Sequence, residues 1–128
     1  MSKDEFNLKV KMNVLVTKED IDDIMACALE GGINYWCRRA EVVGKYLGEF
    51  ASEQISRGGK LKLYDAEEDA VYELTREKFL KGLEKAIVEN YYARYNWCNG
   101  HELDVCMIDA EVADAIVQLA IFDDVIYG

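Results

Sequence analysis

Two short alternating segments joined by an acidic turn restrict the fold of this chain more than any other feature. Leu61 and Leu63 alternate with polar neighbours in residues 60–64, and residues 71–74 have the composition of a partner strand. A period of two places every second side chain on one face of a sheet, and the short turn 65–69 can only join strands that run antiparallel. The sequence therefore predicts a β-hairpin with both leucines facing the core.

A second alternation of apolar and polar residues covers residues 6–16 and predicts a longer strand. It ends at Thr17, which can cap a helix together with Asp20. Gly31 and Gly32 are expected to end that helix in the left-handed conformation. The apolar residues between these limits fall on one helical stripe: Ile21, Ile24, Met25, Ala28 and Leu29.

Two more helices are predicted from caps followed by apolar stripes. Thr75 is expected to cap the first, with Leu74 packing against Phe79 as a hydrophobic staple. Asp109 is expected to cap the second. The stripes are Phe79, Leu80, Leu83, Ile87 and Tyr91 for the first helix, and Val112, Ile116, Leu119 and Ala120 for the second. A short helix over residues 48–57, ending at Gly58 and Gly59, and a short strand at 125–127 complete the prediction.

Residues 33–47 fit two structures. Ile33, Trp36, Cys37 and Ala40 have helical spacing, whereas the alternation that includes Tyr35 favours a strand, and we favour a strand or an irregular segment. Taken together, the elements predict an α+β fold, with a small antiparallel or mixed sheet and three to four helices packed mainly on one side. A chain of 128 residues fits a single domain, here 1–128.

The net charge of −10 is unevenly distributed along the chain. Seven acidic residues and no Lys or Arg follow Arg94. Long nucleic acid needs a contiguous basic surface, so direct binding to it is not expected. No apolar run approaches the roughly 20 residues that span a bilayer, and residues 1–5 lack the pattern of a signal peptide. The sequence therefore predicts a cytoplasmic protein that does not bind membranes.

Catalytic and metal-binding motifs are weak. Cys98, His101 and Cys106, with Asp104, are close enough in sequence to hold zinc, but their spacing matches no strong zinc signature, and an ordinary loop with a buried thiol is favoured. The neighbouring arginines could lower the pKa of Cys37, yet a buried cysteine is the stronger interpretation. No metal and no cofactor are expected. A small carboxylate-based hydrolase remains an alternative because acidic residues are abundant.

The segment from Glu30 to Arg39, with the sequence EGGINYWCRR, is the strongest candidate ligand site. Its glycines permit close backbone approach, its aromatic rings can stack on a base, and its guanidinium groups can form forked bonds to phosphate. Such a set of groups suits a nucleotide-sized pocket. The candidate ligand-binding residues are Gly31, Gly32, Asn34, Tyr35, Trp36, Arg38 and Arg39.

Two structural alternatives stand beside this hypothesis. The same segment can be a helix end followed by two core aromatics and a solvated arginine pair. A second group of aromatic residues could form a partner-binding patch, although half of it must face the core at helical spacing. That group is Tyr91, Tyr92, Tyr95 and Trp97.

The chain resembles small proteins of bacteriophages and prophages of Gram-positive gut bacteria. The resemblance covers residues 30–69, 72–87 and 108–128, and the E-G-G-x-N-Y-W element at residues 30–36 is its sharpest part. It implies a phage-type accessory protein in the cytoplasm of a host bacterium. Small phage proteins of this size often antagonise host defence.

Two functions follow as hypotheses, and neither is catalytic. The first is a small-ligand binder that sequesters a nucleotide-like host immune signal; a homo-oligomer is compatible with it, since such binders often share pockets between chains. The second is an acidic inhibitor of the anti-CRISPR type, which occupies the basic groove of a host defence protein. The partner-binding residues in that case are Asp109, Glu111, Asp114, Asp123 and Asp124.

Overall fold

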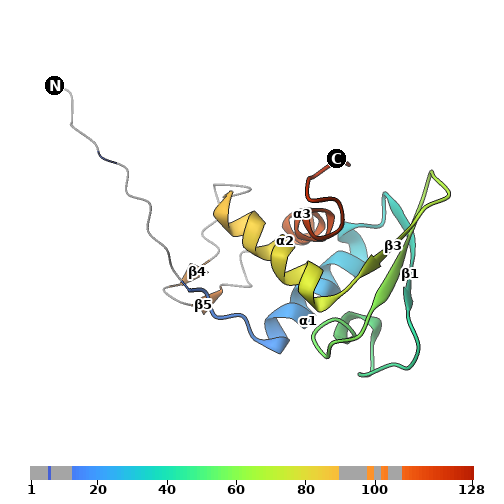
Figure 1. Ribbon diagram of the computed structural model, residues 1–128, viewed down its shortest axis with the longest axis horizontal. Coiled ribbons are helices and arrows are strands. Elements are labelled where there is room, and N and C mark those ends of the chain that lie inside the picture. Colours follow the sequence, from blue (N-terminus) through green and yellow to red (C-terminus); the bar gives the residue numbers. More distant parts are fainter. Residues whose placement is uncertain (1–5, 7–12, 90–97, 100–101, 104–107) are drawn as a thin grey trace.

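A computed structural model describes residue 6 and residues 13–89, 98–99, 102–103 and 108–128 (Figure 1). Most of the strand predicted over residues 6–16 lies outside this part, as do the Tyr91 to Trp97 patch and most of the Cys98, His101 and Cys106 group. Within the described residues the chain has a small α+β fold with one three-stranded antiparallel sheet and three α-helices.

The sheet has the strand order β1-β2-β3, with β1 at Cys37–Val42, β2 at Leu61–Asp65 and β3 at Val71–Leu74. Both neighbouring pairs are antiparallel, so the predicted hairpin is confirmed, and so is a strand within residues 33–47. Leu61 and Leu63 have no exposed surface, as their alternation predicts.

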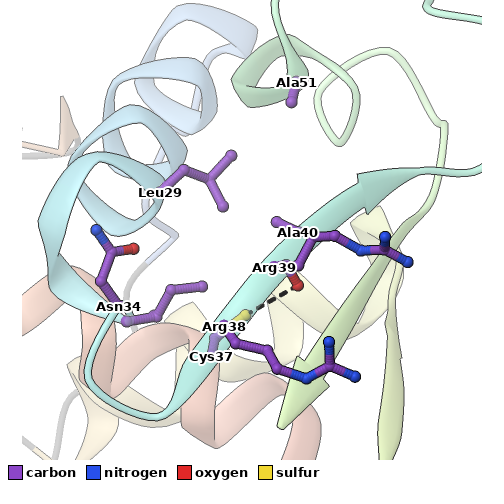
Figure 2. Close-up of a pocket in the computed structure, with 8 residues that line it drawn as sticks. Leu29, Asn34, Cys37, Arg38, Arg39, Ala40 and Ala51 are labelled. Carbon is purple, nitrogen blue, oxygen red and sulfur yellow. Dashed lines mark hydrogen bonds between the residues drawn. The ribbon is translucent and has the colours of Figure 1, made fainter. Parts of the chain in front are cut away.

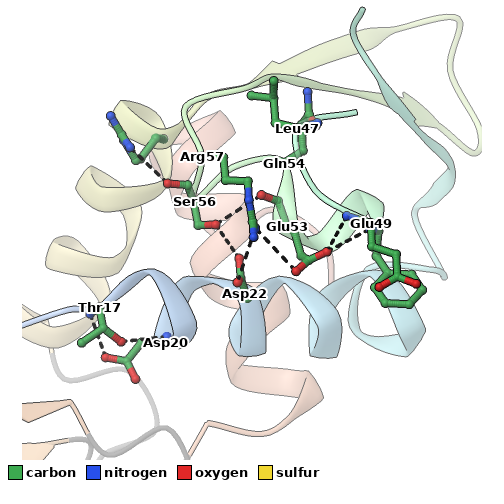
Figure 3. Close-up of polar contacts among 11 residues, drawn as sticks. Thr17, Asp20, Asp22, Leu47, Glu49, Glu53, Gln54, Ser56 and Arg57 are labelled. Atoms are coloured by element: carbon green, nitrogen blue, oxygen red, sulfur yellow. Dashed lines mark hydrogen bonds and ion pairs between the residues drawn. The ribbon is translucent and has the colours of Figure 1, made fainter. Parts of the chain in front are cut away.

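Helix α1, Lys18–Cys27, begins with the predicted capping box: Asp20 N–H donates to the Thr17 hydroxyl, and Thr17 N–H donates to the Asp20 carboxylate (Figure 3). The predicted left-handed end at Gly31 and Gly32 is wrong. The chain instead continues through a π-helical turn, Ala28–Gly32, without a positive φ at either glycine. Gly32 serves close packing, because a Cβ there would lie 2.5 Å from the carbonyl oxygen of Ala110.

Helices α2, Arg76–Val88, and α3, Ala110–Phe122, cross each other (Figure 1). The predicted caps are confirmed: Thr75 accepts from Lys78 N–H, and Asp109 accepts from Val112 N–H. Most of α3 is buried, from Val112 to Leu119, so this helix forms the centre of the core. Phe79 and Leu83 of α2 are buried as predicted, but Leu80 is 39% exposed and lies off the buried stripe.

The segment 43–60 is mostly irregular, and the helix predicted over residues 48–57 shrinks to a 3-10 turn, η2, at Ala51–Glu53. Side chains explain this difference, because they bind backbone groups that a helix would use internally. Glu53 accepts from the N–H groups of Phe50 and Glu49, which together lower the pKa of its carboxyl group, and Gln54 accepts from Leu47 N–H (Figure 3).

This irregular segment is attached to α1 and α2 by polar contacts (Figure 3). Ser56 donates its hydroxyl to Asp22, and Arg57 forms ion pairs with Asp22 and Glu53. Arg76, in the first turn of α2, donates to the carbonyl oxygen of Ser56. The segment is therefore held beside β1 although it has little regular structure.

The segment 123–128 returns over the core after α3. It is not a strand, so that prediction is wrong. Asp123 takes the left-handed conformation with φ of 59°, and the N–H groups of Ile126 and Tyr127 donate to the side-chain oxygen of Gln118 instead of to a neighbouring strand.

Two elements remain in the described part of the chain. Strands β4, Cys98–Asn99, and β5, Glu102–Leu103, pair with each other, and Leu103 N–H donates to the carbonyl oxygen of Leu15. None of the described helices combines the length and the apolar character that crossing a bilayer requires.

Gly82 is expected to be required where α2 crosses α3. A Cβ at this position would lie 2.6 Å from the backbone of both Ile116 and Ala120, which cannot move without shifting α3. Gly82→Ala should lower the free energy of unfolding in urea by about 1–3 kcal/mol. Gly31→Ala is the control, since nothing lies within 4 Å of its Cβ position, and it should be neutral or slightly stabilising. Equal stability of the two variants would contradict this packing.

Candidate functional site

Trp36 lies in the interior of the protein and offers no exposed face. Its side chain is 2% exposed, its ring stacks on Tyr127 at a centroid distance of 5.4 Å and an angle of 5°, and the ring of Phe122 meets it edge-on at 5.7 Å. The prediction that Trp36 offers a free face to a ligand is therefore wrong for this conformation. The physical reason is that helical and turn spacing alone does not show which of two adjacent aromatics faces the core.

Asp114 is also interior, with 7% of its surface exposed. Its carboxylate accepts from the Trp36 indole at 2.7 Å, the Tyr35 hydroxyl at 2.6 Å and the Gln118 amide at 2.9 Å. The prediction that Asp114 belongs to an acidic surface is wrong, because the charge is used to satisfy buried donors. Tyr35 keeps its ring 53% exposed while its hydroxyl is bound.

Asp65 is a second buried carboxylate, although the sequence predicts it as the first residue of the acidic turn 65–69. Its exposed fraction is 1%. One oxygen accepts from the Tyr127 hydroxyl at 2.6 Å and the Tyr72 hydroxyl at 3.0 Å, and the other accepts from the N–H groups of Glu67 and Glu68. The Tyr127 hydroxyl is the largest of the effects that hold the pKa of Asp65 far below its ordinary value, and the same bond raises the pKa of Tyr127.

A signal for the burial of Asp65 does exist in the sequence. The alternation that buries Leu61 and Leu63 continues to Asp65, which stands opposite the buried Cys37 in the sheet. Extending the predicted strand by one residue, to Asp65, would have placed this carboxylate on the inner face.

Arg38 and Arg39 lie together on the exposed face of the sheet. A β-bulge interrupts the pairing of β1 with β2 between Cys37 and Arg39, so Arg38 is an extra residue and both arginines point outward. Their guanidinium carbons lie 5.2 and 4.3 Å from the centre of the Tyr64 ring. Arg38 also donates to the carbonyl oxygen of Asp65. Arg39 forms an ion pair of 3.1 Å with Glu41.

A concavity of about 280 Å³ lies between the π-helical turn, β1 and η2 (Figure 2). Of the candidate ligand-binding residues, Asn34, Arg38 and Arg39 line it, whereas Gly31, Gly32, Tyr35 and Trp36 do not. The remaining lining residues are Leu29, Ile33, Cys37, Ala40 and Ala51. Figure 2 shows both guanidinium groups on the opposite side of β1 from Leu29 and Asn34, so their charges do not point into this hollow.

Cys37 is buried, as the stronger interpretation of its sequence predicted. Its thiol donates to the carbonyl oxygen of Arg39, and burial, the largest effect on this group, raises its pKa. The neighbouring arginines therefore do not produce a thiolate here. Cys37 is a structural side chain beneath the bulge.

The acidic residues after Arg94 do not all lie on one free surface. Asp109 caps α3, Asp114 is buried, and Asp123 forms an ion pair of 3.0 Å with Lys85. Glu111 and Asp124 are exposed. Asp109 and Asp123 stay exposed while they fill these roles, so Asp114 is the one predicted residue of the acidic face that is buried.

The part of the chain that the structure describes contains no cluster of three or more His, Cys, Asp or Glu side chains suited to a metal ion. The candidate group of Cys98, His101 and Cys106 lies outside it, since none of these side chains is described. No protein-family model, curated protein or solved structure matches this chain.

Asp114→Ala is expected to lower the free energy of unfolding by about 3 kcal/mol, because it leaves the buried Trp36 indole without an acceptor. Asp69→Ala is the matched control. It removes the same charge from an exposed position at the hairpin turn and should change stability by less than about 0.5 kcal/mol. Urea denaturation of both variants at pH 7 measures the difference. Similar values for the two would show that the Asp114 bonds are unimportant.

The phenol of Tyr127 is expected to make the fold sensitive to alkali. Its pKa is raised in the folded protein, so the unfolded chain loses this proton first, at about pH 10. The contribution of this hydroxyl group to the free energy of unfolding is therefore fully present below pH 10, and it declines as the pH rises further. Tyr127→Phe should lower Tm by several degrees at pH 7 and flatten its decline above pH 10.

Thermal unfolding between pH 7 and 11.5 tests this expectation. Tyr46→Phe is the control, because Tyr46 is 58% exposed and removing its hydroxyl should leave the profile of the wild type. Tyr72 is present in both variants, and its pKa is also raised in the folded protein. Part of the decline in Tm at alkaline pH should therefore remain in both variants. An unchanged profile for Tyr127→Phe would contradict the role of this hydroxyl.

Proposed function

We propose that this protein acts by non-catalytic binding and that Arg38 and Arg39 hold a small nucleotide-like anion. The observation that carries the proposal is the β-bulge, which brings two consecutive arginines to one face of the sheet. Guanidinium groups bind phosphate through forked hydrogen bonds, so two adjacent groups can contact several phosphate oxygens at once.

The surroundings of the pair support an anionic ligand. Lys62 is exposed on the neighbouring strand, whereas the whole chain carries a net charge of −10. Glu41, which forms the ion pair with Arg39 and stands opposite Lys62, is the carboxylate that a bound anion would displace. A local cluster of cations on an acidic protein selects small anions over long nucleic acid, which would be repelled elsewhere. Both guanidinium groups already lie over the Tyr64 ring in the free protein. The arginine side chains therefore lose less conformational entropy when they bind a ligand.

The acidic and thiol groups near this face support binding over catalysis. Asp65 and Asp114 are each surrounded by hydrogen-bond donors, and Cys37 is held as a thiol. Groups used in this way stabilise the fold and are not poised to transfer protons to a substrate.

The biological setting of this proposal comes from the resemblance to phage and prophage proteins. A phage-type accessory protein that binds nucleotide-like anions would sequester a host immune signal in the bacterial cytoplasm. Sequestration needs affinity alone, which suits a site built from guanidinium groups on a sheet surface.

Isothermal titration with AMP, GMP, cyclic AMP, cyclic GMP and inorganic phosphate tests the proposal. Arg38→Gln with Arg39→Gln should raise Kd for the bound nucleotide at least about tenfold. Lys18→Gln with Lys81→Gln is the control, since it removes the same charge from exposed positions on α1 and α2 and should leave Kd within about threefold.

A third variant separates geometry from charge. Arg38→Lys with Arg39→Lys keeps both charges but loses the planar fork, and it should bind more weakly than the wild type. No binding across the whole set of anions, or equal losses in the glutamine variant and its control, would disprove the proposal.

A further inference from the structure

We infer that the face of Trp36 is a second binding site, for a flat heteroaromatic ring with an N–H donor on its edge, and that Tyr127 fills it in the free protein. This inference goes beyond the arginine pair, which lies on the exposed face of the sheet, and does not depend on it. The ligand class we assign is a purine base of the hypoxanthine or guanine type.

The first argument is the position of the Tyr127 ring. It lies parallel to the Trp36 ring, with 5.4 Å between centroids and 5° between planes, which is the geometry of a base stacked on an aromatic platform. The ring of Phe122 closes one side at 5.9 Å. Without the Tyr127 side chain, the space left would be a flat slot with an aromatic floor.

The second argument is the chemistry at the end of this slot. The Tyr127 hydroxyl donates to the Asp65 carboxylate at 2.6 Å, and Tyr72 donates to the same oxygen. The other oxygen of Asp65 accepts two backbone N–H groups. A ring that replaced Tyr127 would face a negative oxygen with one acceptor position free, so its edge must present a donor. The N1–H group of hypoxanthine or guanine is such a donor.

The third argument is the way in which the segment 123–128 is held. It turns away from α3 at Asp123, in the left-handed conformation, and its N–H groups at Ile126 and Tyr127 depend on the single side-chain oxygen of Gln118. It pairs with none of the strands that the structure describes. Tyr127 is held by hydrogen bonds to Gln118 and Asp65 and by ring contacts with Trp36 and Phe122, and a competing ring has to replace the Asp65 bond and the ring contacts.

This arrangement makes the apparent affinity depend on Tyr127. A site that is open in only a fraction of molecules binds its ligand more weakly by that same fraction. Removing the competing ring should therefore raise affinity, which is the opposite of what the loss of a contact residue does.

Inosine is the probe, because it has a hypoxanthine base and no phosphate for the arginine pair. In the 128-residue chain, Tyr127→Ala should bind inosine at least about tenfold more tightly than the wild type. Ile126→Ala is the control, since this side chain is 55% exposed and its backbone N–H is kept, and it should match the wild type. In a Trp97→Phe background, inosine should quench the emission of Trp36.

The matched ligand is 1-methylinosine, which lacks the N1–H donor and should bind Tyr127→Ala at least about tenfold more weakly than inosine. Equal binding of the two nucleosides, or inosine binding by Tyr127→Ala no tighter than by the wild type, would overturn the inference. So would a peptide of residues 122–128 binding the variant when inosine does not, because the slot would then be specific for the chain itself.

Circular dichroism shows whether Tyr127→Ala is folded. If it is not, Tyr127→Phe replaces it. In this variant the ring stays but its bond to Asp65 is lost, so inosine should bind at least about threefold more tightly than to the wild type, and equal affinity would overturn the inference.

The two proposals fail separately. Nucleotide binding that needs Arg38 and Arg39 but ignores Tyr127 removes only the slot. Inosine binding by Tyr127→Ala, together with nucleotide binding that Arg38→Gln with Arg39→Gln leaves unchanged, removes only the anion site.

Discussion

The buried carboxylate of Asp114 is the interaction on which the rest of the structure depends. It accepts from Trp36 and Tyr35, which lie in the turn before β1, and from Gln118 one helical turn further along α3. Gln118 in turn accepts from the backbone of Ile126 and Tyr127. One charge, satisfied by three donors, thus joins the central helix to the start of the sheet and to the segment that follows the helix.

A second buried carboxylate, Asp65, binds the same C-terminal segment to the sheet. It receives the hydroxyl groups of Tyr72 and Tyr127, so β2, β3 and the segment 123–128 meet at one side chain. Trp36 lies between the two carboxylates, bonded to one through its indole and covered by the ring whose hydroxyl reaches the other. Both aspartates are buried because the fold supplies enough donors to replace water.

Local patterns predicted the hairpin, the strand within residues 33–47 and the caps at Thr17, Thr75 and Asp109, because period and capping chemistry act over a few residues. They did not predict which face of the turn would be buried. Trp36 and Asp114 are 78 residues apart in sequence, and their bond decides that the indole is internal. The prediction for the end of α1 was wrong for a similar reason. Gly32 is needed because Ala110 of another helix packs closely against it, and not because its backbone is left-handed. The sequence identified Arg38 and Arg39 as candidate ligand residues. It did not predict that both side chains point outward, because this depends on a β-bulge that no local pattern indicates.

The bulge at Arg38 has a consequence for how this surface can change. Cys37 and Ala40 point toward the core, while Arg38, Arg39 and the facing Tyr64 do not share that packing. Substitutions on the outer side of β1 and β2 can therefore accumulate without creating cavities beneath them. The sequence of this outer surface can therefore diverge quickly among descendants of one ancestral chain while the packing on the inner side of the sheet stays the same.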